Sequence, residues 1–170
     1  DIRQDSRIHQ AVFDDIVSHP DIQRYVENLP ENYTHLSLEE RLDILPQLKG
    51  KVPADIFENK MTRYTLGSIY AMQSIQVSNG ERACHRYIIS NCGSLESILQ
   101  LFALHRLCGW EEPTVDMIPL FETVDDLQAS EEIMRKLYAN PTYKAHLAQR
   151  KNKQTIMLGF SDGTKDGGYI

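Results

Sequence analysis

The stretch RYIISNCGSLESILQLFALHRLC, residues 86–108, sets the fold class. It begins with a short β-branched and aromatic run, which is typical of a buried strand. A turn follows at residues 91–93, and Ser94 then stands at the N-cap position of a helix. Apolar residues recur at helical spacing over more than one face of that helix, at Leu95, Ile98, Leu99, Leu101, Phe102, Leu104 and Cys108. The stretch therefore predicts a strand followed by a helix that is buried on several sides.

The same alternation extends in both directions along the chain. Strand patterns occur at residues 1–5, 86–90, 115–121 and 154–160. Helical patterns occur at residues 8–16, 21–29, 37–48, 61–78, 94–108, 130–139 and 142–150. Ser37 with Glu40, and Thr123 with Asp126, have the spacing of capping boxes. The charged segment 49–60 is expected to be a solvent-facing connection.

Strands that alternate with helices predict a parallel α/β architecture. Parallel strands need helices on both faces or around a barrel, and four strands are too few to close one. We therefore expect part of a parallel (β/α)8-type barrel with extra helices and about half of its strands, forming a single partial domain over residues 1–170. The abrupt start without Met suggests an internal piece of a longer protein. Uncovered strand edges in such a piece favour self-association.

The composition narrows the class of protein. Of the 170 residues, 41% are hydrophobic and 25% are charged, as in a soluble globular domain. The net charge of −6 argues against a general nucleic-acid surface. There is no apolar run long enough for a membrane span and no signal peptide at the start. Three cysteines without a CxxC pair indicate reduced, buried thiols in a cytoplasmic protein.

Polar residues lie at or just after the exit of each predicted strand. They are Arg3, Asn91 and Cys92, Glu122, and Ser161 with Asp162 and Lys165. Because the carboxyl ends of parallel strands meet at one rim, these side chains are expected to lie together. Glu122 and Asp162 could hold a hard divalent cation such as Mg²⁺. Arg3 and Lys165 could neutralise a phosphate beside it.

Each of these residues also has a simpler interpretation. Glu122 could charge the first turn of the next helix, and Asp162-Gly163 could be an ordinary turn. The glycine-rich end of the chain lacks the GxxxxGK[ST] spacing of a phosphate-binding loop, so an ATPase is not indicated. The six histidines lack metal-ligand spacing and are interpreted as structural or surface residues, His9 included.

Four blocks of sequence are similar to one known family. TIMLGFSDGTKDGG, residues 155–168, closely resembles the signature of phosphoenolpyruvate carboxylases, in which VMIGYSDS is followed by a small residue and KDAG. Residues 118–127, IPLFETVDDL, resemble VPLFETLDDL of that family. DIRQDSRIH at 1–9 and YIISN at 87–91 resemble DVRQES with a following His, and YVISM. The blocks occur in the family's order and reach from one end of the chain to the other.

The resemblance implies an activity and a set of site residues. The family enzyme is a largely cytosolic, usually tetrameric barrel protein, several times longer than this chain. It carboxylates phosphoenolpyruvate with bicarbonate, giving oxaloacetate and phosphate, and needs Mg²⁺ or Mn²⁺. Glu122 and Asp162 match its metal-binding carboxylates, Arg3 matches an arginine that contacts the substrate phosphate, and Lys165 matches a lysine close to the substrate. Neither a nucleic acid nor a membrane is expected as a partner.

The chain departs from the family pattern in two ways. Glycine stands where the signature has Ser and Ala, although Asp162 and Lys165 keep their separation, and Asn91 stands where Met is frequent. The family's catalytic histidine and its glycine- and arginine-rich loop are not in these 170 residues, so the isolated chain is expected to be inactive. Two alternatives stay open: a non-catalytic phosphate- or metal-binding or interaction module, and another barrel enzyme that uses phosphoenolpyruvate.

Overall fold

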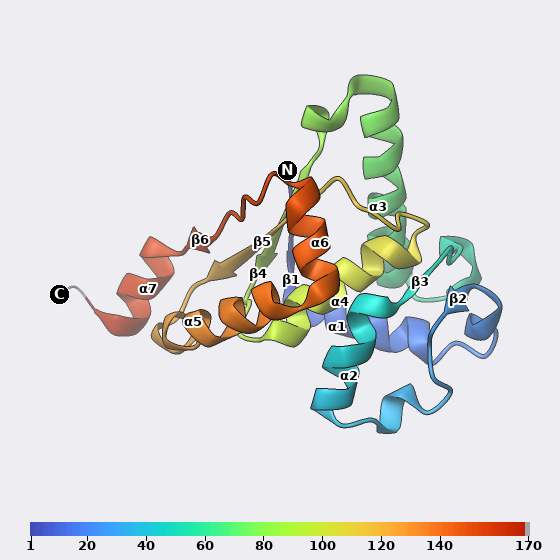
Figure 1. The fold of residues 1–170 in the computed structure, drawn as a ribbon, viewed down its shortest axis with the longest axis horizontal. Coiled ribbons are helices and arrows are strands. Elements are labelled where there is room, and N and C mark those ends of the chain that lie inside the picture. The colour runs from blue at the N-terminus through green and yellow to red at the C-terminus, as the bar shows by residue number, and fades with distance from the viewer. Residues whose placement is uncertain (169–170) are drawn as a thin grey trace.

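A computed structural model describes residues 1–168 of the chain (Figure 1). Four parallel strands form one sheet, and their order is β1, β4, β5, β6. The strands are β1 (Ile2–Asp5), β4 (Arg86–Ser90), β5 (Asp116–Phe121) and β6 (Met157–Leu158). The predicted parallel α/β class is thus confirmed. All four expected strands are present, although the last is much shorter than residues 154–160.

The last strand is short because a side chain replaces part of its backbone pairing. Gln154 Nε2 donates a hydrogen bond to the carbonyl of Met117 in β5 at 2.7 Å. The backbone therefore joins the sheet only from Met157, and the Gly159 N–H continues the pairing by donating to the Phe121 carbonyl at 3.0 Å. This contact lies between segments far apart in sequence, so the local pattern could not predict it.

Helices follow the strands, and all but the last lie where helical patterns were predicted. They are α1 (Ser6–Val17), α2 (Leu38–Ile44), α3 (Lys60–Asn79), α4 (Leu95–Leu107), α5 (Val124–Ala139), α6 (Pro141–Gln149) and α7 (Phe160–Gly167). Both expected capping boxes are present, at Ser37 and Thr123. The α4 helix is buried on several sides, as predicted. Within the described residues, no helix has the length and apolar character that crossing a membrane requires.

Helices cover one face of the sheet more completely than the other. In β4, Tyr87 and Ile89 are fully buried, whereas Arg86 on the opposite face is exposed. Tyr87 packs against His9 of α1 and His105 of α4, with ring centroids 5.4 Å apart in each pair. A sheet with one face packed under helices and the other partly open is compatible with part of a barrel. Among residues 1–168, the strands do not close into a complete barrel.

Two segments differ from expectation. Residues 21–29 were predicted to be helical, but they form a 3-10 turn at Ile22–Arg24 and then β2 (Val26–Glu27). This strand pairs antiparallel with β3 (Lys49–Gly50), which lies in the segment predicted to be a solvent-facing connection. That connection also buries Val52 and Phe57 in the core. Burial of apolar side chains and pairing with a distant strand outweigh local helix propensity here.

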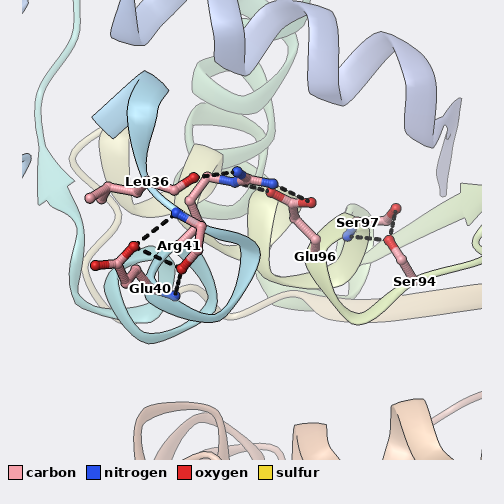
Figure 2. A network of polar contacts seen from close by, with 7 residues as sticks. Leu36, Glu40, Arg41, Ser94, Glu96 and Ser97 are labelled. Atoms are coloured by element: carbon pink, nitrogen blue, oxygen red, sulfur yellow. Dashed lines mark hydrogen bonds and ion pairs between the residues drawn. The ribbon is translucent and has the colours of Figure 1, made fainter. Parts of the chain in front are cut away.

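A bidentate ion pair fastens α2 to α4 (Figure 2). Arg41 Nε and Nη2 donate to the two carboxylate oxygens of Glu96 at 2.8 and 3.4 Å, and Arg41 Nη1 donates to the Leu36 carbonyl at 2.8 Å. Both side chains are mostly buried. The pair therefore holds the residues 36–44 against the first turn of the central helix.

The three cysteines are free and buried, as expected. Burial raises the pKa of the Cys92 thiol to about 12 and raises the pKa of Cys108 further. Both thiols are therefore protonated and unreactive at neutral pH.

Candidate functional site

The candidate site lies at the carboxyl edge of the sheet. Arg3 comes from β1, Glu122 directly follows β5, and Asp162 lies in the first turn of α7, after β6. Arg3 Nη2 donates to Glu122 Oε1 at 3.3 Å, across 119 residues of sequence. The structure therefore brings together residues from three of the four predicted strand ends.

Glu122 is held from both sides. Its second oxygen, Oε2, accepts a hydrogen bond from the backbone N–H of Asn91 at 2.7 Å. Asn91 adopts a left-handed backbone conformation (φ 54°) directly after β4, and its carbonyl accepts from the buried Ser6 hydroxyl at 2.6 Å. The part of Asn91 that contacts the site is thus its backbone. A sequence pattern identifies side chains, so this contact was not predicted.

Glu122 and Asp162 both lie close to Gly159. A Cβ atom at Gly159 would be 3.2 Å from Glu122 Cγ and 3.6 Å from Asp162 Oδ2. The glycine therefore leaves room for two carboxylates to approach the same point. Glu122 is 18% exposed and Asp162 is 50% exposed, so the pair faces solvent from one side.

Lys165 is less closely attached to this group. Its Nζ lies 4.0 Å from Asp162 Oδ1, and its side chain is 80% exposed. In the described part of the chain, Asp162 is its only ion-pair partner. The structure thus gathers Arg3, Glu122 and Asp162, and leaves Lys165 on the outer face of α7.

The segment that carries Asp162 is a helix, although no helical pattern was identified after residue 150. Residues 169–170 lie outside the described residues, and α7 covers Phe160–Gly167. Asp166 Oδ2 accepts the backbone N–H of Val124 at 2.9 Å, at the start of α5. A Cβ atom on Gly167 would lie 2.8 Å from Val124 Cγ2. The glycine-rich sequence therefore allows close packing of α7 on α5, which fixes the position of Asp162.

The donor set fits a divalent cation that shares its shell with a substrate. Residues 1–168 contain no cluster of three or more His, Cys, Asp or Glu side chains that could enclose a metal ion. Mg²⁺ commonly takes only one or two carboxylates and completes its shell with waters and substrate phosphate oxygens. Glu122 and Asp162 can supply those carboxylates, and Arg3 places a guanidinium beside them.

Gly159→Ala tests this geometry. The backbone of Gly159 (φ −87°) accepts alanine, so the effect arises from the added methyl group pushing against Glu122. We expect affinity for Mn²⁺ to fall by about tenfold. Gly67→Ala is the matched control: no atom lies within 4 Å of its added Cβ in α3. That control should bind Mn²⁺ normally and should raise the free energy of unfolding by roughly 0.5–1 kcal/mol. Equal Mn²⁺ affinity in both variants would contradict the proposed geometry.

Comparisons with known proteins identify relatives along the whole chain. The family model described as phosphoenolpyruvate carboxylase matches residues 1–170. The phosphoenolpyruvate carboxylase of a Synechococcus strain is 34% identical, over 100% of this chain and 16% of its own length. That of Corynebacterium diphtheriae is 33% identical, over 100% of this chain and 19% of its own length. The chain therefore spans less than a fifth of these curated relatives, and the resemblance seen in the four sequence blocks is confirmed.

Proposed function

The chain belongs to the phosphoenolpyruvate carboxylase family, and we propose that it supplies part of the catalytic centre of such an enzyme. The reaction would be the Mg²⁺-dependent carboxylation of phosphoenolpyruvate by bicarbonate to oxaloacetate and phosphate. The observation that carries the proposal is the contact between Arg3 and Glu122, with Asp162 beside it, at the carboxyl edge of a parallel sheet. Chemistry is concentrated at this edge in parallel α/β folds.

In this proposal, Glu122 and Asp162 hold the metal ion, for which Mn²⁺ can substitute. The bound ion would supply Lewis-acid polarisation of substrate oxygens. Arg3 presents several N–H donors, and only one of them is used by Glu122, so the others can bind the substrate phosphate. The Asn91 N–H orients Glu122, and Lys165 adds positive charge from α7.

The assembly and location also belong to the proposal. Exposed apolar side chains lie in and just after β6, an edge strand of the sheet: Leu158 is 52% exposed and Phe160 is 84% exposed. Such an edge favours contact with another polypeptide segment of the same protein or with another subunit. We accordingly propose a cytoplasmic homotetrameric parent enzyme, and we expect the isolated chain to self-associate through this edge.

The isolated 170-residue chain is expected to show no turnover with phosphoenolpyruvate, bicarbonate and Mg²⁺. The family's catalytic histidine and its glycine- and arginine-rich loop are not in these 170 residues, and an incomplete site lacks the preorganised charge that catalysis needs. A coupled assay for oxaloacetate measures this directly. Turnover by the pure chain would contradict the prediction.

Mn²⁺ binding tests the metal assignment separately from activity. Electron paramagnetic resonance of free Mn²⁺ should show binding to the chain that weakens at least about tenfold in Asp162→Asn. Asp55→Asn, on the exposed surface and outside the site, is the control and should bind as the unchanged chain does. If Asp162→Asn and the unchanged chain bind equally, Asp162 is not a metal ligand and the interaction-module alternative gains support.

A further inference from the structure

A hollow lies at the edge of the sheet opposite the candidate site, where the strands begin. Its volume is about 620 Å³, and it opens beside the first residues of β4 and β5. Positively chargeable residues dominate its lining, namely Arg82, His85, Arg86, Arg150, Lys151 and Lys153. They come from the turn before β4, from β4 itself, and from the loop between α6 and β6.

The hollow carries a surplus of positive charge. The only carboxylates in its lining, Glu81 and Asp116, both pair with Arg150, at 2.6 and 2.7 Å. In the part of the chain that the structure describes, the other Arg and Lys side chains of the lining form no ion pair and no side-chain hydrogen bond. The lining thus holds five Arg and Lys side chains against two carboxylates, a net charge of +3, in a chain whose net charge is −6. A concave cationic surface on an acidic protein concentrates anions.

The cationic side chains of the hollow extend from a well-fixed part of the backbone. The Arg150 side chain is only 9% exposed, and its two ion pairs join the end of α6 to the start of β5 and to the turn before β4. Lys151 and Asn152 both adopt left-handed conformations, with φ of 60° and 54°. Their N–H groups bond back to the carbonyls of Ala148 and Leu147 in α6. Two successive residues in this conformation are unfavourable unless the surrounding structure holds them. The turn that they form places Lys151 and Lys153 in the lining of the same hollow.

One polar atom in the lining lacks a partner. His85 Nδ1 is buried and makes no hydrogen bond within residues 1–168. Buried polar atoms normally have a partner, so the wall of the hollow contains one unmet hydrogen-bonding group. It lies immediately before Arg86, whose guanidinium is exposed in the hollow.

We propose that this hollow binds a phosphorylated small molecule. The volume is in the range of small-molecule sites. A phosphate ester carries between one and two negative charges at neutral pH, and its oxygens match the fork of an arginine. One or two phosphate groups would balance the surplus charge. The site lies at the amino ends of the strands, so it is separate from the site that contains Glu122, and the inference does not depend on the proposed function.

Isothermal titration with inorganic pyrophosphate tests the inference on the protein at its full natural length. We expect the double variant Arg86→Gln/Lys151→Gln to raise the Kd for pyrophosphate at least about tenfold. The matched control is Arg24→Gln/Lys144→Gln, which removes two exposed cations outside the hollow and should leave the Kd unchanged. Asp162→Asn should also leave it unchanged, since that residue belongs to the other edge. Higher salt should weaken the binding.

Several results would overturn the inference. They are an absence of pyrophosphate binding, equal weakening in the two double variants, and binding of succinate as tight as that of pyrophosphate. The last result would mean that the hollow does not select phosphate. If the double variant fails to fold, Lys153→Gln serves in its place, because this exposed side chain can be replaced without disturbing the pairs of Arg150. Unchanged pyrophosphate affinity in that variant would then count against the inference.

Discussion

Glu122→Gln is expected to lower the carboxylation of phosphoenolpyruvate by about 100- to 1000-fold in the protein at its full natural length. The amide has the shape of the carboxylate and can still accept the Asn91 N–H, so the local structure should be retained. It loses the negative charge that pairs with Arg3 and that the proposed metal ion requires. The measurement is kcat and KM at saturating Mg²⁺, with Mn²⁺ affinity determined in parallel.

Glu131→Gln provides the control for this prediction. Glu131 is exposed on α5, outside the candidate site, and forms no ion pair among residues 1–168. Its replacement should leave both kcat and Mn²⁺ affinity unchanged. If Glu122→Gln keeps kcat within about threefold of the unchanged protein, the carboxylate serves only the first turn of α5, as the simpler interpretation holds.

The parts of the fold that the sequence predicted are those encoded locally. The capping side chains of Ser37, Ser94 and Thr123 each accept the backbone N–H three positions along, so the sequence spacing predicts them directly. The α7 helix was not predicted, because Gly163 and Gly167 lower helix propensity. It forms with support from α5, through the bond from the Val124 N–H to Asp166. Such tertiary support commonly decides the state of a short helix.

The candidate site was predictable in its residues but not in its contacts. Topology alone placed Arg3, Glu122 and Asp162 at one rim, because Arg3 lies near the exit of the first parallel strand and the two carboxylates follow later ones. The pairing of Arg3 with Glu122 depends on the strand order β1, β4, β5, which no local pattern gives. The cationic hollow was missed for the same reason. Its cations come from two segments, residues 82–86 and 150–153, which are more than 60 positions apart and meet only in the folded chain.

Three buried histidines are expected to make the protein sensitive to mild acid. Burial lowers the pKa of His9, His105 and His146 to about 4 each. Their rings pack against aromatic side chains, and each has one buried nitrogen that lacks a hydrogen-bond partner in the described residues. A protonated ring would therefore place an uncompensated charge in the core.

The direction of the effect follows from proton binding. Between about pH 4 and the ordinary histidine pKa of 6.5, the unfolded chain binds more protons than the folded one. The contribution of these rings to stability is fully present above pH 6.5 and is lost as the pH falls toward 4. Between about pH 7 and pH 5, each histidine should cost about 2 kcal/mol of unfolding free energy, so the three together should cost about 6 kcal/mol. That is comparable to the whole stability of many domains.

Urea unfolding at a series of pH values between about pH 7 and pH 5 measures this loss. His146→Gln should reduce the pH dependence by about one third, because one of three titrating rings is removed while the other two are retained. His35→Gln is the control, since that ring is exposed beside a surface turn and should leave the slope unchanged. Carboxylates such as Asp5, whose pKa is lowered by hydrogen bonds from Arg7, lose their contribution only in more acidic solution, so they do not obscure the histidine slope. An identical slope in His146→Gln and the unchanged protein would show that the acid sensitivity has another origin.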